Sequence, residues 1–360
     1  MWNPFEFLFP KKFLGIDIGT SYLKVVELSK AGHQQKLENY GTLQSSVIYQ
    51  KPFRTFEKNT LVLSSEDIAR AILAIIKETR IKTRACTLSI PDFSTFFTNI
   101  ELPPMTREEL PEAVRAEARS HIPLPIGEVT LDWQVIEGEV SDTKKTNLKI
   151  LLVAVPNEVI NQYQRIAKIA DLELIALEAE VFGLIRSLVD EEEKRPISII
   201  DIGARSTTCS IVEKKKLKIS HSFDMSGNEL TRMVAKSLNI DYQEAENLKK
   251  KYGISNVEGK AGEVKEVLLP LIDVIVRESE RIFNTFSSTE RKEIQKVILT
   301  GGTALLPGLK DYFAKKFKKE VEVTNPFTRI FYPPILEKTL ENLGPSYAIA
   351  VGMALRGFEY

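Results

Sequence analysis

Two stretches of the sequence repeat one pattern: an apolar run, the tripeptide Asp-Ile-Gly, a turn rich in hydroxyl side chains, and a second apolar run. The turn follows Asp17 in the first stretch and Asp201 in the second. Glycine lets the backbone turn sharply, and the N–H groups and hydroxyls of such a turn form a concave set of donors suited to phosphate oxygens. An aspartate at a strand end can hold Mg²⁺ directly or through water, because hard cations prefer oxygen ligands. The pattern therefore predicts two turns that bind phosphate and Mg²⁺.

The two turns supply matching sets of candidate ligands, and both aspartates are candidate Mg²⁺ ligands. The first set is Asp17, Gly19, Thr20, Ser21 and Lys24, whose ammonium can add a point charge for a β- or γ-phosphate. The second set is Asp201, Gly203, Ala204, Ser206 and Thr207. Each turn alone is equally consistent with an ordinary Asp-Gly hairpin. Their recurrence, once in each half of the chain, favours a shared phosphate site.

A pair of glycines marks a third candidate element, in the stretch "LTGGTALLPGL". Gly301 and Gly302 follow a short apolar run, and their lack of side chains would let a nucleoside lie flat against the backbone. Thr303 offers a hydroxyl contact beside them. The alternative is a glycine-rich loop between a strand and a helix, with no ligand.

The elements that must position these residues alternate between strands and helices, which predicts an α/β fold. Both Asp-Ile-Gly turns are flanked by residues typical of strands, so each is expected to be a strand–turn–strand unit. In the first half, further strands are expected at 36–43 and 85–91. A helix is expected to begin near Ser64, with Ile68, Ile72, Ile75 and Ile76 on one apolar face.

Residues 92–171 have strands and helices of their own, which indicates an inserted α+β subdomain. Thr106 and Glu109 form a capping box for a helix through Arg119, between a strand at 94–102 and strands at 129–137 and 148–156. Asn157 is expected to cap the next helix. The inward residues expected in that helix are Val159, Ile160, Tyr163, Ile166 and Ile169.

The charged stretch "DEEEKRP" is the expected boundary between the two halves. In the second half, helices are expected at 228–238, at 242–253 and after Pro270, the last with Ile272, Ile275, Ile282, Phe283 and Phe286 inward. The predicted organisation is a tail at 1–12, a first half at 13–190, a second half at 196–345 with a helical part at 226–290, and a closing helix at 346–360.

Composition adds little that is specific. The formal net charge is zero, which gives no support for a nucleic-acid partner. The two cysteines form no CxxC pair and no run approaches the length of a membrane span, so we expect a cytoplasmic protein without disulfides. The aromatic start "MWNPFEFLFPKK" lacks the features of a signal peptide. We expect it to pack on its own domain, with a membrane-surface or partner contact as the alternative.

The stretches "GIDIGTSYLKVVEL", "IIDIGARSTTCSIVE" and "VILTGGTALLPG" resemble the two phosphate motifs and the adenosine motif of the actin-like ATPase superfamily, which includes actin, heat-shock chaperones, sugar kinases and the division protein FtsA. The resemblance implies two related halves with ATP and Mg²⁺ in the cleft between them. It also implies that Glu246 accepts from the ribose hydroxyls and that Lys249 flanks the base, since "EAENLKKKYG" is similar to the nucleoside-contacting helix. An exposed charged helix face is the alternative.

Within that superfamily the chain is most similar to the type IV pilus assembly family PilM, over roughly residues 13–356. The block from Met105 to Ile136, the turn "IPLP", the triplet Asn325-Pro326-Phe327 and "YAIAVGMALR" carry the similarity. The family implies an FtsA-like, ATP-binding protein at the cytoplasmic face of the inner membrane. Its implied partners are the cytoplasmic N-terminal peptide of a PilN-like bitopic protein and other pilus components. From the residues themselves, Phe96, Phe97 and Ile100 are candidate peptide contacts, or else ordinary core positions.

Two other functions stay open. An FtsA-like polymerising division protein would share the ATP site, but such proteins usually carry an amphipathic membrane helix after the fold, and this sequence stops at Tyr360. A small-molecule kinase would need a carboxylate base beside a polar substrate cluster, which does not stand out. We expect slow ATP hydrolysis or none, since the sequence identifies no residue that orients a water.

Overall fold

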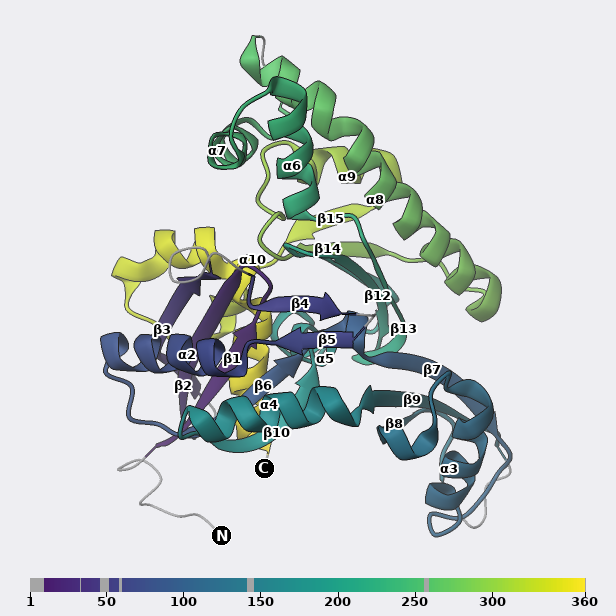
Figure 1. Cartoon of the computed structure of the whole chain (residues 1–360). Helices are drawn as coiled ribbons and strands as arrows, with labels where there is room; N and C mark the ends of the chain where they lie inside the picture. Colours follow the sequence, from purple (N-terminus) through teal and green to yellow (C-terminus); the bar gives the residue numbers. More distant parts are fainter. Residues whose placement is uncertain are drawn as a thin grey trace.

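Two five-stranded sheets with the same strand order form the frame of the molecule. The structure is a computed structural model that describes residues 10–32, 34–45, 52–57, 60–140, 146–255 and 259–359. In each sheet an antiparallel three-stranded meander is extended by two parallel strands. The first sheet has the order β10-β6-β1-β2-β3, with β1 (Lys11–Ile18), β2 (Tyr22–Ala31), β3 (Gln34–Gln44), β6 (Ala85–Ile90) and β10 (Glu173–Ala179). The second has the order β13-β12-β11-β14-β15, with β11 (Ile197–Ile202), β12 (Thr207–Glu213), β13 (Lys216–Phe223), β14 (Lys296–Thr300) and β15 (Glu320–Val323). The two related halves expected from the repeated hairpins are therefore present (Figure 1).

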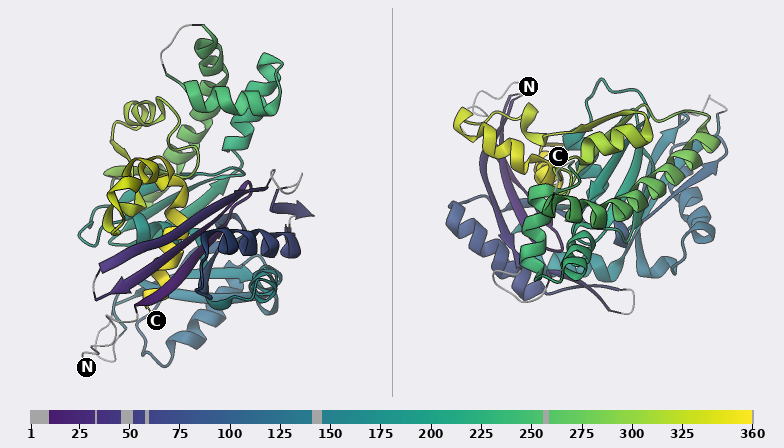
Figure 2. Two further views of the ribbon diagram at one scale, coloured as in Figure 1. Left: turned by 90° about the vertical axis from the view of Figure 1, so that its left-hand side faces the viewer. Right: turned by 90° about the horizontal axis from the view of Figure 1, so that it is seen from above.

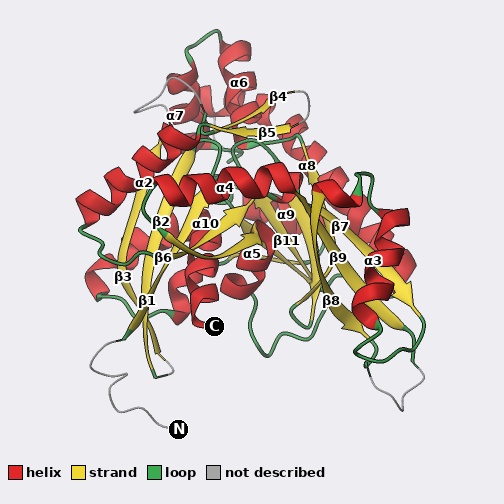
Figure 3. Cartoon of the chain, turned by 60° about the horizontal axis from the view of Figure 1, so that its bottom comes forward, coloured by secondary structure: helices red, strands yellow, loops and turns green. Residues whose placement is uncertain are grey.

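Helices cover both sheets and meet between them. Helices α2 (Ser65–Thr79) and α4 (Asn157–Ile169) pack side by side on the first sheet and share its core (Figure 3). Helices α5 (Glu180–Leu188) and α10 (Glu337–Arg356) pack against each other on the side that faces the second sheet. Helix α10 also contacts β1 and β2, so the chain ends against the first half (Figure 2).

A third, three-stranded sheet builds the inserted part of the first half. Its order is β7-β9-β8, and α3 packs on one face through its own apolar core. The bounds are β7 (Phe96–Leu102), α3 (Leu110–His121), β8 (Val129–Glu137) and β9 (Leu148–Pro156). Helix α4 instead places Val159, Tyr163 and Ile166 in the core of the first sheet. We therefore propose that the inserted subdomain ends near residue 156 rather than 171.

Four helices surround the second sheet away from the first half. They are α6 (Gly227–Leu238), α7 (Tyr242–Tyr252), α8 (Lys260–Glu290) and α9 (Leu309–Phe317). The expected start of the long helix after Pro270 is wrong, because α8 begins ten residues earlier and runs through the proline. Leu268 and Ile272 are buried on either side of it. Packing on both sides outweighs the single backbone donor that the proline removes.

The remaining elements are short. A two-stranded sheet of β4 (Arg54–Glu57) and β5 (Thr60–Leu63) was not expected from the sequence. The 3₁₀ helices are η2 (Asp92–Ser94), η3 (Ile126–Glu128), η4 (Pro326–Arg329), η5 (Pro334–Leu336) and η6 (Gly357–Glu359). Both cysteines, Cys86 and Cys209, are free and buried. Within the described ranges, no helix is long and apolar enough to cross a membrane.

Several local expectations need correction. Asn157 does not cap α4; it is the first helical residue, and its side chain bonds Thr130 and the carbonyl of Gly127. Ile169, at the end of that helix, is 41% exposed rather than inward. The closing helix begins at Glu337 and contains Pro345, where the proline was expected to precede it. Strand β1 already begins at Lys11, within the expected tail; residues 1–9 lie outside the described residues.

Candidate functional site

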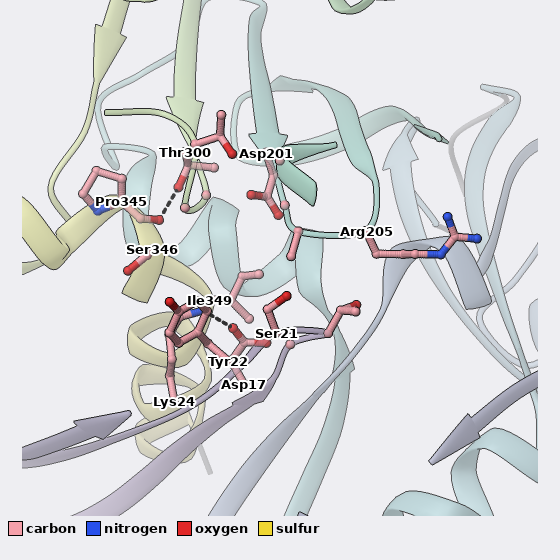
Figure 4. A pocket seen from close by; sticks show the side chains of 18 of the residues that line it. Asp17, Ser21, Tyr22, Lys24, Asp201, Arg205, Thr300, Pro345, Ser346 and Ile349 are labelled. Carbon is pink, nitrogen blue, oxygen red and sulfur yellow. Dashed lines mark hydrogen bonds and ion pairs between the residues drawn. The ribbon is translucent and has the colours of Figure 1, made fainter. Parts of the chain in front are cut away.

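A cavity of about 470 Å³ lies between the two sheets, and three chain turns of the predicted site border it. These turns follow β1 and β11, the corresponding central strands of the two sheets, and β14, which lies next to β11. The cavity is lined by every residue predicted to hold nucleotide except Thr207: Asp17, Gly19, Thr20, Ser21, Lys24, Asp201, Gly203, Ala204, Ser206, Glu246, Lys249, Gly301, Gly302 and Thr303. Residues more than 280 positions apart in sequence thus meet in one cavity (Figure 4).

The first turn is fixed by its hairpin and by two backbone hydrogen bonds from later segments. Phe53 N–H donates to the carbonyl of Thr20 (3.1 Å), and Ser45 N–H donates to that of Ser21 (2.9 Å). Gly19 is required here, since a Cβ would lie 2.6 Å from the carbonyl oxygen of Tyr22. Gly19, Thr20 and Ser21 of this turn line the cavity.

The second turn repeats this geometry with one exception. Gly203 N–H donates to the carbonyl of Ser206 (3.0 Å), which closes the turn, and Gly203 in turn accepts from the N–H of Gly227 (2.9 Å). Thr207 points away from the cavity and donates from Oγ1 to the carbonyl of Met225 (2.5 Å). Thr208, which sequence reasoning passed over, lines the cavity instead.

The glycine pair serves two different geometric needs. Gly301 has φ of +88°, and a Cβ there would lie 2.3 Å from Oδ1 of Asp201. At Gly302 a Cβ would meet no atom within 4 Å, so the backbone there borders open space in the cavity wall. The turn is tied to α10 by Thr300 Oγ1 and Gly301 N–H, which both donate to the carbonyl of Pro345 (2.9 and 3.1 Å; Figure 4).

Lys249 and Glu246 form a buried ion pair on α7, with Nζ 2.7 Å from Oε2. Lys249 Nζ also donates to the carbonyl of Gly227 (2.9 Å) and to Oγ1 of Thr231 (2.7 Å). Burial lowers the pKa of Lys249 despite this carboxylate. Burial raises the pKa of Glu246, but Lys249 and the other donors outweigh it, so the pKa lies below its ordinary value. Glu246 therefore presents a charged acceptor at the cavity wall, suited to hydroxyl donors.

A cluster of buried charges under the phosphate turns was missed in the sequence. Arg54 Nη2 lies 2.8 Å from Oε1 of Glu180 and 3.7 Å from Oδ1 of Asp17. Asp92 accepts from the N–H of Val181 (3.1 Å), and its own N–H donates to Glu180 (3.4 Å). Glu180 lies 88 positions from Asp92 and 126 from Arg54, and no local motif marks these contacts. Only the folding of β4, η2 and α5 onto β1 brings them together.

The charges around Asp201 change its protonation. Burial, and after it the carboxylates of Glu180 and Asp17, raises the pKa of Asp201 to about 7. Lys24 and Arg54 oppose this rise. A divalent cation between the carboxylates would favour their ionised forms. Two carboxylates and several hydroxyl residues that line one cavity fit a Mg²⁺-bound polyphosphate, since Mg²⁺ usually takes one or two carboxylates plus phosphate oxygens and water.

The candidate peptide contacts lie in two different environments. Ile100 is 1% exposed in the core of the inserted subdomain, and Phe96 packs against the same core. Phe97 is half-buried and meets Phe182 edge to face, with ring centroids 6.2 Å apart. A separate groove of about 810 Å³ runs between β8 and β10, lined by half-buried apolar residues that include Val153, Ile160 and Ile175. None of the three predicted contacts lines it.

Comparison with known proteins agrees with this architecture. Cell division protein FtsA of Enterococcus hirae is 24% identical over 351 residues, 87% of this chain and 78% of that protein. FtsA of Enterococcus faecalis is 26% identical over 192 residues, 48% of this chain and 43% of that protein, so the matched region spans less than half of that relative.

Solved structures place the fold among the actin-like ATPases. A PilM–PilN type IV pilus biogenesis complex superposes with a TM-score of 0.80 and 25% identity, covering 96% of this chain and 98% of that one. MreB5 of Spiroplasma citri bound to AMPPNP superposes with a TM-score of 0.54 and 14% identity, covering 96% of this chain and 95% of that one. The model of the family "Type IV pilus assembly protein PilM" matches residues 15–358. The chain therefore belongs to the PilM family of type IV pilus assembly proteins.

Proposed function

We propose that the chain binds ATP with Mg²⁺ in the cavity between its two sheets. The observation that carries this is the convergence of two Asp-Ile-Gly turns and a glycine pair on one cavity. The turn amides and the hydroxyls of Thr20, Ser21 and Ser206 hold phosphate oxygens, while Asp17 and Asp201 hold the metal. The metal, when bound, neutralises charge on the β- and γ-phosphates. Glu246 accepts from the ribose, and the open backbone at Gly302 faces the nucleoside.

We further propose that the chain is a scaffold of the pilus inner-membrane complex. The PilM–PilN complex among the similar structures supports a PilN-like partner, and the expected ligand is its cytoplasmic N-terminal peptide. The chain would then lie at the cytoplasmic face of the inner membrane, peripheral to it, beside other pilus components. Nucleic acid has no part in this proposal.

The groove between β8 and β10 is the site that we favour for this peptide. Each strand is the edge of its own sheet, and β-sheet edges offer unpaired backbone groups to which an extended peptide can add. Val153, Ile160 and Ile175 provide apolar contacts for side chains of such a peptide. Phe97 lies beside the groove through Phe182, so it stays a candidate, whereas Ile100 has no accessible surface to offer.

In this proposal, binding of ATP changes the conformation of the chain, and hydrolysis of ATP is not required. The two phosphate turns belong to different halves, so a nucleotide that contacts both favours the closed arrangement of the cleft. The inserted subdomain contacts the second half through Asn99 and Lys218, whose carbonyl accepts from the Asn99 side chain (2.8 Å). Closure of the cleft would therefore shift the inserted subdomain, including β8, and change the shape of the groove.

A thermal-unfolding titration tests both proposals. Mg²⁺ and ATP at about a hundredfold excess over Kd should stabilise the chain by about 2.7 kcal/mol, and the PilN-like peptide should add to this. Ile175→Glu should abolish only the peptide effect, because Ile175 lines the groove and is not part of a core cluster. Leu73→Glu, at an exposed apolar residue on α2, is the matched control. Peptide binding that is equally tight with and without MgATP would disprove the switch. Assembly into filaments that sediment only with MgATP would favour the FtsA-like alternative.

A further inference from the structure

Glu180 lies at the end of the cavity where the phosphates are proposed to bind, and its carboxylate has no role in the proposed nucleotide site. Among the described residues that line the cavity, Asp17 and Asp201 are the proposed metal ligands, and Glu246 lies on α7 near Lys249. Glu180 lines the same cavity as Asp17 and Asp201, and Arg54 Nη2 links it to Asp17, at 2.8 Å from Oε1 of Glu180 and 3.7 Å from Oδ1 of Asp17. Its position at the first residue of α5 fixes its backbone where α5 begins beside the cavity.

Both carboxylate oxygens of Glu180 are already engaged by the protein. Oε1 accepts from Arg54 Nη2 at 2.8 Å, and Oε2 accepts from the N–H of Asp92 at 3.4 Å. Arg54 is 5% exposed, and it comes from β4, which belongs to neither phosphate hairpin. An isolated buried charge is costly unless it is paired. The ion pair between Arg54 and Glu180 is therefore a specific contact between the small β4–β5 sheet and α5.

We propose that Arg54 is a positioning residue that keeps Glu180 from orienting a water toward the γ-phosphate, and so makes the chain hold ATP rather than turn it over. This inference rests on the proposed nucleotide site. In hydrolysis the water oxygen forms a bond to the γ-phosphorus, and the bond to the β–γ bridging oxygen breaks with its electron pair leaving on ADP. The water proton passes to the acceptor that orients the water, and from there to the released phosphate or to solvent.

A carboxylate bound to a guanidinium is a poor acceptor for that water. Arg54 holds Oε1 through a charge-assisted hydrogen bond and the N–H of Asp92 holds Oε2, so the orientation of the carboxylate is fixed. Each oxygen keeps a further lone pair, but the positive charge of Arg54 reduces the basicity of the carboxylate as an acceptor of the water proton. Freeing Glu180 should therefore increase turnover without removing a phosphate donor from either hairpin.

The experiment compares turnover and affinity in Arg54 variants of the full chain. In Arg54→Gln we expect the ATP turnover rate to rise at least about tenfold, which is about 1.4 kcal/mol in barrier. The Kd for MgATP should change by less than about tenfold, since Arg54 also lies 3.7 Å from Oδ1 of the proposed metal ligand Asp17. Arg54→Lys should give a smaller rise, because an ammonium holds a carboxylate at a single point. Arg54→Gln/Glu180→Gln should return to the low rate. Arg70→Gln, on the exposed face of α2, is the matched control and should change neither quantity.

A second readout needs no nucleotide. Arg54→Gln leaves Glu180 buried without its cation, so its melting temperature should fall, and the additional Glu180→Gln change should restore part of the loss. If Arg54→Gln does not fold, the double variant and Arg54→Lys carry the test. Unchanged or reduced turnover in Arg54→Lys and Arg54→Gln, or a Kd weakened more than about tenfold with no gain in turnover, overturns the inference and makes Arg54 a phosphate ligand. A wild-type chain that shows no binding of MgATP refutes the nucleotide site itself, while the thermal cycle still reports the Arg54–Glu180 contact.

Discussion

Lys24 lies directly opposite Asp17 in the β1–β2 hairpin, with its Nζ 3.1 Å from Oδ2. The lysine that the sequence suggests for phosphate is thus paired with the aspartate suggested for metal. Ser89 donates to the other oxygen of Asp17 (3.2 Å), and Arg54 lies 3.7 Å from it. A metal at Asp17 must compete with these contacts, so binding of Mg²⁺ and release of Lys24 toward a phosphate are expected to occur together.

The equivalence of the two hairpins predicts equivalent effects of their aspartates. Asp17→Ala and Asp201→Ala should each weaken MgATP binding by about 10- to 100-fold. Each substitution removes one charged oxygen ligand and leaves the metal held by the remaining aspartate alone. Isothermal titration with ATP, with and without Mg²⁺, measures this. Asp311→Ala, an exposed position on α9, is the control. A normal Mg²⁺ requirement in Asp201→Ala would contradict the symmetry of the site.

The raised pKa of Asp201, about 7, predicts a specific pH dependence. In the unfolded chain this carboxyl titrates near 3.8. Between about pH 4 and pH 7 the folded chain therefore keeps a proton that the unfolded chain has lost, and the free energy of unfolding falls as pH rises, by at most about 1.4 kcal/mol per unit. Above pH 7 this contribution stays constant. MgATP binding, which needs the ionised form, should strengthen over the same window.

Asp201→Asn isolates this effect. Urea unfolding of nucleotide-free protein at pH 5, 6, 7 and 8 should show a shallower decline in the variant than in the wild type. Burial also raises the pKa of Asp92 and Glu180, so part of the decline should remain. Parallel curves for the two proteins would contradict the assignment to Asp201.

The parts of the site that local sequence predicted are those that a few neighbouring residues build. A turn such as Asp17 to Ser21 needs only its own glycine and its flanking strands, so a short stretch of sequence is enough to predict it. Arg54 and Glu180 were invisible because nothing local distinguishes them from a surface arginine and a helix-starting glutamate. Arg54 and Glu180 become part of the site through a contact across 126 positions, and that contact depends on how β4 and α5 pack on the first sheet.

The errors in the predicted elements have the same origin. Pro270 and Pro345 were expected to lie outside helices, as local rules suggest, but both lie inside long helices whose neighbours are buried. Thr207 was chosen from the repeated turn pattern alone, whereas alternation along β12 sends the side chains of Thr207 and Thr208 to opposite faces of the sheet. Tertiary packing decides such cases, and a single sequence does not contain it.

Lys249 should contribute more to stability than its exposed neighbour. Lys249→Met removes three buried hydrogen-bonding contacts and leaves the carbonyl of Gly227 and the hydroxyl of Thr231 without this donor, so the free energy of unfolding should fall by about 2–3 kcal/mol. Lys250→Met, whose side chain is 58% exposed, should cost less than about 1 kcal/mol. Urea unfolding compares them, and equal losses would show that Lys249 is not a structural anchor of α7.

The contact of α5 with α10 leaves no room for a methyl group at Gly352. A Cβ there would lie 2.0 Å from the carbonyl oxygen of Gly183, which is backbone and cannot yield without separating the helices. Gly352→Ala should therefore destabilise the chain by about 2–4 kcal/mol. Gly183→Ala should cost less, because its closest neighbour is the terminal methyl of Met353, a flexible group. Gly127→Ala, with no atom within 4 Å of its Cβ, should change the free energy of unfolding by less than about 0.5 kcal/mol.

The same substitution at Gly352 should also affect the cavity. Helix α10 contains Pro345, whose carbonyl accepts the hydrogen bonds that hold the glycine turn. Gly352→Ala should therefore weaken MgATP binding, whereas Gly127→Ala should not. A loss of stability in Gly352→Ala with unchanged affinity would show that α10 does not transmit its packing to the cavity.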